Sequence, residues 1–113
     1  MVTEKQLDTL FQQYACKQLS AISYAKAQVG HHIVGRANKM LRWDIRNCLP
    51  LTHEEHQMLH AGNITWRPDL DLSEYLINTG NIQLKDYLVQ NGLSMQDFMN
   101  NKQKDLEEAI NLY

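Results

Sequence analysis

The residues best suited to chemistry in this sequence are its five histidines, which all lie between positions 31 and 60. His56 and His60 are four residues apart, so on a helix their imidazoles point the same way, about one turn apart. Neutral imidazole is a common ligand of zinc and neighbouring transition metals. The pair predicts part of a metal site; the alternative is two surface histidines on an amphipathic helix.

The dipeptide His31-His32 lies upstream of that pair, in a segment, 31–34, with the composition of a β-strand. Successive side chains of a strand point to opposite faces. One of the two imidazoles can therefore face the helix and complete a three-histidine site, while the other stands beside whatever the metal binds. A histidine dipeptide on its own would carry no such signal.

Asn47 lies between the two histidine pairs. A side-chain amide at such a position can lock a loop, because it both accepts hydrogen bonds from the backbone and donates to it. An ordinary turn residue is the alternative. The order is then His-His, Asn fifteen residues later, His nine residues on and His four residues on.

The stretch 31–60, HHIVGRANKMLRWDIRNCLPLTHEEHQMLH, resembles the motif of the HNH (His-Asn-His) endonucleases, which have the ββα-metal fold. Its spacings are similar to those of the HNH nuclease domains of bacterial toxins. The LRWD segment followed by Asn is similar to HNH proteins of phages and prophages. The resemblance covers about 31–62 and implies a short two-stranded hairpin followed by a helix.

The resemblance also implies a role for each matching residue. His31, His56 and His60 match metal ligands, His32 matches the general base that activates water, and Asn47 matches the residue that organises the loop and orients the base or helps to bind metal. The implied cofactor is one divalent ion: Mg, Mn, Ni or Zn. An imidazole that titrates near neutral pH can serve as the general base, and the divalent ion can serve as a Lewis acid. The implied reaction is hydrolysis of DNA phosphodiester bonds to 5′-phosphate and 3′-hydroxyl ends, in phage or mobile-element DNA processing.

Many HNH proteins also carry a structural zinc knuckle built from two CxxC pairs. This sequence has Thr52 and Glu55 where the second pair would fall, and Cys16 is followed three residues later by Leu19. We therefore expect no zinc knuckle, and the flanking helices must supply the hydrophobic core that zinc would otherwise replace.

Several other residues between positions 36 and 53 have two interpretations each. We predict phosphate contacts with DNA from three cationic residues: Arg36, Lys39 and Arg42. Arg36 is the strongest candidate of the three. The alternative is that all three are solvated surface charges. Arg46 is expected to be a surface charge.

Trp43 is expected to anchor the core of the hairpin rather than stack on a base. Asp44 could orient a histidine or lie at the surface. We expect His53 to be a first-turn surface residue rather than a fourth ligand, and Cys48 to be buried rather than a ligand.

The elements that must position these residues can be read from caps and periodicity. Thr52-His53-Glu54-Glu55 is a capping box, so a helix should cover 53–61. Thr3 and Ser94 are further N-caps. The expected elements are helices over 3–19, 53–61, 73–78, 82–90 and from 95, extended segments at 31–34 and 41–51, and a helix-compatible stretch at 20–30.

These elements predict an α+β, mostly helical fold: a ββα-metal core flanked by an N-terminal helix and several C-terminal helices. We expect one domain over 1–113, with an N-terminal helical segment (1–30), the HNH core (31–62) and a helical C-terminal extension (63–113).

Composition limits the other possibilities. The chain has 113 residues, two cysteines, 43% hydrophobic residues and net charge −2. Neither the Rossmann nor the P-loop glycine fingerprint is present. With no signal-like N-terminus, no membrane-length apolar run and no disulfide framework, we expect a cytoplasmic protein without a membrane partner.

The net charge is unevenly distributed along the chain: it is +1 over residues 1–30, +2 over residues 31–67 and −5 over residues 68–113. DNA is the expected partner of the middle segment, and the acidic C-terminal helices could form a homodimer or bind a protein partner. The alternative function is a non-catalytic DNA- or protein-binding protein, inhibitory or regulatory, built on the HNH fold.

Overall fold

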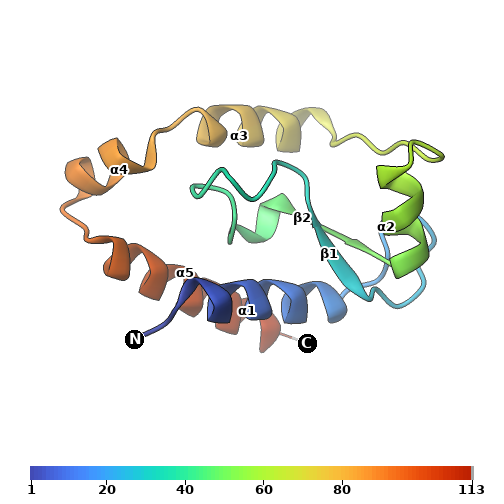
Figure 1. Ribbon diagram of the computed structural model, residues 1–113, viewed down its shortest axis with the longest axis horizontal. Coiled ribbons are helices and arrows are strands. Elements are labelled where there is room, and N and C mark those ends of the chain that lie inside the picture. Colours follow the sequence, from blue (N-terminus) through green and yellow to red (C-terminus); the bar gives the residue numbers. More distant parts are fainter. Residues whose placement is uncertain (113) are drawn as a thin grey trace.

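The computed structural model describes residues 1–112, which follow the colour ramp of Figure 1 from blue to red. The predicted α+β, mostly helical class is confirmed: helices surround a two-stranded antiparallel hairpin. The elements are α1 (Glu4–Cys16), β1 (Val29–His32), the 3₁₀ turn η1 (Ile45–Asn47), β2 (Cys48–Leu51), α2 (His53–His60), α3 (Leu70–Gly80), α4 (Leu84–Asn91) and α5 (Met95–Ile110).

The hairpin and α2 form one continuous unit in the chain. β1 pairs with β2 in a register that places Val29 opposite Leu51 and His32 opposite Cys48. Thr52 follows β2 directly and caps α2, with the reciprocal hydrogen bonds to Glu55 that the sequence predicted. Because no loop separates strand from helix, α2 packs against both strands.

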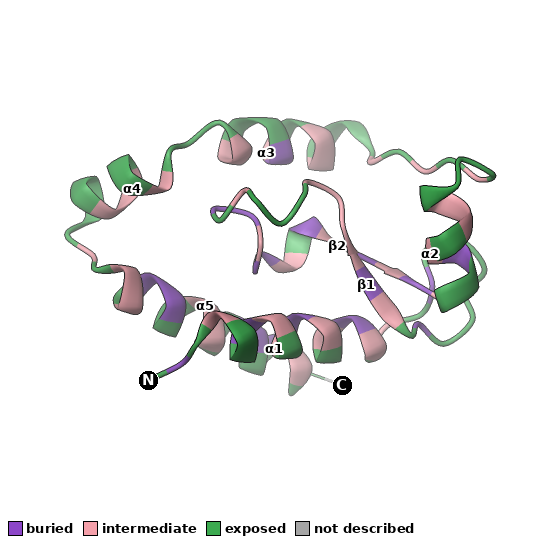
Figure 2. Ribbon diagram, in the orientation of Figure 1, coloured by how far each residue is buried: buried purple, intermediate pink, exposed green. Residues whose placement is uncertain are grey.

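α1 is the element that joins the hairpin to the C-terminal segment. Thr3 is its N-cap, as expected, and also forms a capping box with Gln6, but the helix ends at Cys16 rather than near 19. Its buried stripe of Leu7, Phe11 and Ala15 is turned toward the hairpin (Figure 2), and α1 also packs along α5.

Strand β1 lies unusually close to α1 at Gly30. A Cβ at this position would come within 2.9 Å of Ala15 Cβ and 3.0 Å of Cys48 Sγ. Gln12 reinforces the contact, because its amide donates to Gly30 O and accepts from Gly30 N. Glycine is needed here for close approach of helix and strand.

Residues 20–30 were expected to be compatible with a helix, but residues 20–28 form a turn that leads into β1, and residues 29–30 already belong to that strand. The Ser20 hydroxyl accepts hydrogen bonds from the amides of Ile22 and Ser23, so these amides bond to a side chain rather than along a helix. Strand β1 consequently begins at Val29, two residues before the predicted strand 31–34.

The predicted extended segment 41–51 is wrong over its first half, since only Cys48–Leu51 is a strand. Asp44 accepts a hydrogen bond from Arg46 N and caps η1, which turns the chain before β2. Leu41 and Trp43 are nevertheless buried, so their apolar character reflects the core and not a strand.

Among the C-terminal helices, α5 is capped by Ser94 as predicted. α3 begins at Leu70, capped by Asp69, rather than at Ser73, and α4 begins at Leu84 rather than at residue 82. α3 and α4 lead from α2 back to α5 along the side of the molecule opposite α1 (Figure 1). Within residues 1–112, the helices are all too short or too polar to cross a lipid bilayer.

The main core cluster lies between α1, the 40–43 turn and α5. Its buried members are Val2, Leu7, Met40, Trp43, Phe98, Met99 and Leu106. The same α1 therefore contributes to this core and supports the hairpin that carries the histidines.

Candidate metal centre

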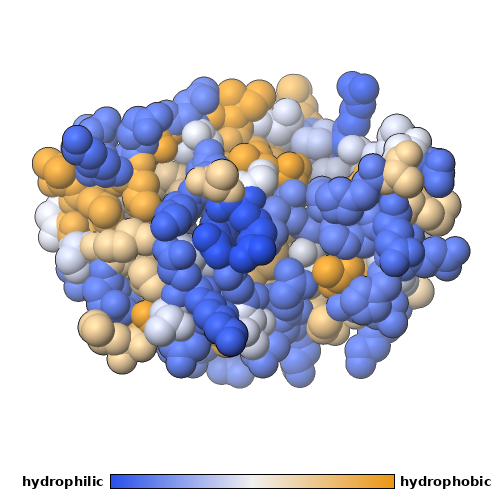
Figure 3. Space-filling view, in the orientation of Figure 1, coloured by the Kyte–Doolittle hydropathy of each residue, from blue (hydrophilic) through white to orange (hydrophobic). Residues whose placement is uncertain are grey.

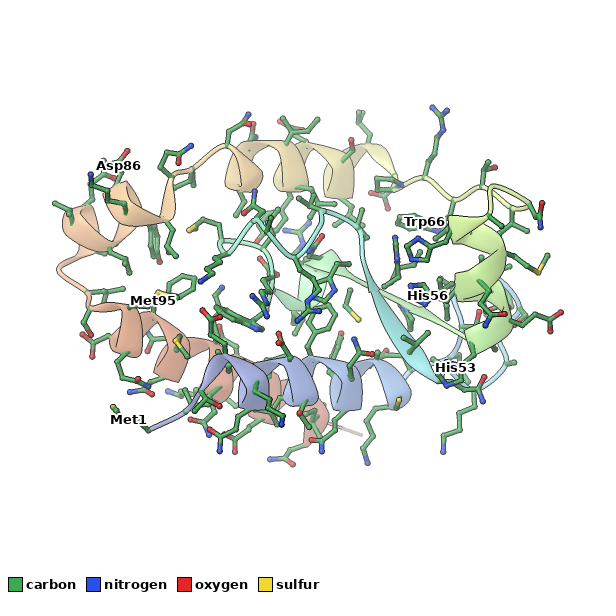
Figure 4. All side chains as sticks on the ribbon, in the orientation of Figure 1. Met1, His53, His56, Trp66, Asp86 and Met95 are labelled. Atoms are coloured by element: carbon green, nitrogen blue, oxygen red, sulfur yellow. The ribbon has the colours of Figure 1, made fainter. Side chains whose placement is uncertain are left out.

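Three of the predicted residues meet between β1 and α2. His31 projects from β1, and His56 and His60 lie one turn apart on α2. One ring nitrogen of each lies within 4.8 Å of the others, and the ring centroids are 5.3, 5.3 and 4.5 Å apart. Figure 4 shows His56 on the side of α2 that faces β1. The structure thus brings together all three residues that the sequence proposed as metal ligands.

The protonation of this cluster suits metal binding. Burial first, and then the charges of the neighbouring imidazoles, lower the pKa of His31 to about 4. Burial also lowers the pKa of His56, and the charge of His60 adds to that effect. Neutral imidazoles offer lone pairs, and the Nε2 atoms of His56 and His60 are only 2.9 Å apart.

The three histidines match the ligand pattern of a catalytic metal ion rather than that of a structural ion with four protein ligands. Three imidazoles are the protein ligands of one well-known class of zinc site, in which the fourth position is left to water or substrate. Within residues 1–112, the group that could hold a metal consists of these three histidines. His53 is exposed on the first turn of α2 and lies outside the group, as expected.

His32 occupies the opposite face of β1 and has a different environment. Its ring stacks on Phe11, with centroids 4.2 Å apart and planes 6° from parallel, and its Nε2 lies 2.9 Å from Arg42 O. Because a carbonyl oxygen only accepts, Nε2 carries the proton, and Nδ1 is the basic nitrogen of the neutral ring. Burial lowers the pKa of His32, although the bond to the carbonyl acts in the other direction.

A cleft of about 580 Å³ connects the two environments. It is lined by His31, His32, His56 and His60, and also by Asp8 and Gln12 of α1 and by Arg36. Sequence reasoning missed Asp8 and Gln12. Their i, i+4 spacing beside the apolar stripe of α1 was the available signal, but nothing in the sequence linked α1 to the histidine motif.

Asn47 locks the loop between the strands, as its type and position predicted. It is fully buried, and its Oδ1 accepts from Val34 N at 2.7 Å while its Nδ2 donates to Val34 O and Leu41 O. These bonds fix both ends of the 34–41 loop. Arg42, whose carbonyl contacts His32, is the next residue, so Asn47 positions the partner of the predicted base.

The three cations predicted to contact DNA are all paired with α1. Arg36 and Arg42 bind Asp8 at 3.0 and 2.8 Å, and Lys39 binds Glu4 at 2.8 Å. The Arg36 side chain is 60% exposed and lines the cleft, whereas that of Arg42 is only 15% exposed. Of the three, the structure brings only Arg36 to the cleft wall.

Asp8 is the centre of this network. Burial alone would raise the pKa of Asp8. Hydrogen bonds from Arg42 and Trp43 and the charges of Arg42 and Arg36 act in the opposite direction, and together they hold this pKa below its usual value. Trp43 donates its Nε1–H to Asp8 Oδ1 and is 1% exposed, so it is a core anchor and not a base-stacking residue.

The remaining candidates are structural. Asp44 accepts from the Tyr75 hydroxyl and from Arg46 N, so it ties α3 to η1 rather than orienting a histidine. Arg46 is exposed and lies over the Tyr75 ring at 3.9 Å. Burial raises the pKa of the half-buried Cys48 thiol to about 12, which makes it a poor metal ligand at neutral pH.

No family model, curated protein or solved structure matches this chain.

Proposed function

We propose that this protein is a metal-dependent endonuclease that hydrolyses phosphodiester bonds of DNA, with β1, β2 and α2 as an HNH-type ββα-metal core. The observation that carries the proposal is the convergence of His31, His56 and His60 within 4.8 Å, beside a second histidine of the same strand whose ring is oriented by a backbone carbonyl. The resemblance of residues 31–62 to the HNH motif supports the same assignment.

In this proposal the three converging histidines hold one divalent ion. When bound, the ion supplies Lewis acidity for the phosphate and for the departing 3′-oxygen. Three imidazoles favour binding of Zn or Ni, whereas turnover in similar enzymes often uses Mg or Mn.

His32 acts as general base in the proposed reaction. Its neutral Nδ1 takes a proton from the attacking water, and the resulting imidazolium keeps its Nε2–H bond to Arg42 O. Stacking on Phe11 limits rotation of the ring. Asn47 holds the loop that presents this carbonyl. At the cleft wall, Arg36 can release its ion pair with Asp8 and bind a DNA phosphate instead.

The test is cleavage of plasmid and branched DNA by the purified protein with Mg, Mn, Ni or Zn, beside an EDTA control. We expect metal-dependent cutting that is lost in His32→Ala, while the variant still binds the metal. His53→Ala is the matched control and should cut normally, because His53 is exposed and outside the site. Undiminished cutting by His32→Ala would contradict the proposed base.

A non-catalytic metal-containing DNA- or protein-binding protein is the second candidate. The observation in its favour is that the charges of Lys39 and Arg42 are already neutralised by Glu4 and Asp8, which leaves a weak positive patch beside the cleft. Metal binding without DNA cleavage in the presence of Mg, Mn, Ni or Zn would favour this candidate. His32→Ala would then bind metal and its partner as the wild type does.

A further inference from the structure

A second groove runs along the outer face of α1, next to the histidine cleft. It has a volume of about 670 Å³ and is lined by side chains of α1 with Lys26 and Ile110. Asp8 and Gln12 line both this groove and the histidine cleft, so the two hollows share a wall. The groove therefore lies directly beside the histidine cleft.

The groove carries three lysines that the proposed chemistry does not use. Lys5, Lys17 and Lys26 all line it and are all exposed. None of them forms an ion pair in the part of the chain that the structure describes. This distinguishes them from Arg36, Lys39 and Arg42, whose charges are compensated by α1.

The groove contains little negative charge to oppose these lysines. Asp8 is the single carboxylate among its lining residues, and it is already bound by Arg36 and Arg42. Asp105 and Glu108 of α5 line a separate hollow beside Trp43. The residues that line the groove include three lysines and one carboxylate, so they carry a formal charge of +2, which favours an anionic ligand.

We propose that this groove is a phosphate-backbone track that binds DNA on one side of the bond that is cut. The inference rests on the proposed nuclease function and extends it, because it assigns a long polyanionic substrate rather than a small phosphodiester. Lys5 and Lys17 are twelve residues apart, or about 18 Å along a helix axis. That distance corresponds to about five nucleotides of one strand of B-DNA.

The groove is tested by DNA binding in EDTA, where no cutting occurs, using fluorescence anisotropy of a labelled duplex. The test variant is Lys5→Gln/Lys17→Gln/Lys26→Gln. The control, Lys85→Gln/Lys102→Gln/Lys104→Gln, removes the same charge from α4 and α5. We expect the test variant to bind at least about tenfold more weakly at low salt, and its slope of log affinity against log salt to fall by about three.

The control variant should keep the wild-type salt slope. Equal slopes for wild type and the groove variant would overturn the proposal, as would equal losses in the two variants. Lysine-dependent binding of polyglutamate that is tighter than binding of the duplex would also overturn it, and would assign the groove to an acidic protein partner.

Hydrolysis of bis(p-nitrophenyl) phosphate separates the groove from the metal centre, because this substrate is too small to reach both. The groove variant should hydrolyse it at the wild-type rate but should cleave long DNA with a raised KM. If wild type binds DNA with the expected lysine dependence yet hydrolyses neither substrate, the groove is supported and the nuclease proposal is contradicted.

Discussion

At the scale of single residues, His31 and His32 differ because a strand sends successive side chains to opposite faces. His31 faces the α2 histidines, whereas His32 stacks on Phe11 of α1. One backbone step therefore separates a proposed metal ligand from a proposed base. The hydrogen bond to Arg42 O then selects which nitrogen of His32 is basic.

The ligand assignment predicts a large effect of His60→Ala on metal affinity. His60 is exposed, so its removal leaves the core intact, but it removes one of three donors. We expect zinc affinity to fall at least about 100-fold by isothermal titration calorimetry, a loss larger than that usually seen for an outer-shell partner. His53→Ala is the matched control; a similar loss there would show that the zinc is bound elsewhere on α2.

At the scale of elements, α1 decides how the hairpin and its loop are held. It approaches β1 at Gly30, where Gln12 bonds both backbone groups. It also contributes Asp8, which binds the side chains of Arg36, Arg42 and Trp43 from the following loop. The orientation of His32 thus depends on a helix that lies well before it in the chain.

The close approach at Gly30 predicts that Gly30→Ala is destabilising. The added Cβ would meet Ala15 Cβ at 2.9 Å and Phe11 at 3.2 Å, and both belong to the packed face of α1. Overpacking of this kind costs about 1–3 kcal/mol, measured by urea unfolding. Gly35→Ala is the control, because no atom lies within 4 Å of its Cβ position; an equal effect of both substitutions would contradict the close-approach argument.

The Asp8 network predicts a pH-dependent contribution to stability. Asp8→Asn should lower the free energy of unfolding at pH 7 by about 1.5–3 kcal/mol, as expected for hydrogen bonds to charged groups. Because the folded state holds the pKa of Asp8 below its usual value, the ionised carboxylate is stabilising above about pH 3.9, and this contribution is lost as pH falls through the folded pKa.

The difference in unfolding free energy between wild type and Asp8→Asn should accordingly shrink in acid. Urea titrations from neutral pH to about pH 3, which lies below the usual carboxyl pKa, would measure it. A difference that stays constant, or grows, below that pKa would contradict the proposed role of the ionised carboxylate.

At the scale of the whole molecule, the two ends of the chain are joined through the α1–α5 contact. The core cluster contains Leu7 of α1, Trp43 of the central loop and Leu106 of α5. α3 is attached more locally, through the bond from Asn38 Nδ2 to Gly80 O and through Tyr75 and Asp44. Unfolding of the C-terminal segment should therefore disturb the central core as well.

Leu106→Ala tests this coupling. Leu106 is fully buried, so the substitution should cost about 2–5 kcal/mol. The loss should appear equally in tryptophan fluorescence and in far-UV circular dichroism, because a cooperative fold gives coincident transitions. Leu112→Ala, at a position 83% exposed, should have little effect; separate transitions for the two probes would show that the ends unfold independently.

The homodimer or partner contact predicted for the C-terminal helices stays a prediction. Hydrophobic residues are visible at the surface over α4 and along α3 (Figure 3). Leu70 and Ile77 of α3 and Val89 of α4 have exposed side chains. A homodimer would have twice the monomer mass in size-exclusion chromatography with light scattering. A monomer at all concentrations would contradict it.

Local signals in the sequence determined much of the framework. The N-caps at Thr3, Thr52 and Ser94 act within one helical turn, so the sequence alone located those three helix starts. The helical spacing of His56 and His60 and the alternation of a strand were enough to propose a cluster with one histidine of the His31-His32 pair, and the resemblance to the HNH motif selected His31. The assignment to the HNH endonucleases stays a prediction that cleavage assays must test.

Only the tertiary structure decided what surrounds that cluster. The bonds from Arg36, Arg42 and Trp43 to Asp8 span 28 to 35 residues, and no local periodicity encodes such separations. The same holds for the turn at 41–47, whose apolar residues looked like a strand but fill the core between α1 and α5. Long-range packing determines which charges are compensated: it pairs Arg36, Lys39 and Arg42 with carboxylates of α1, whereas Lys5, Lys17 and Lys26 form no ion pair within residues 1–112.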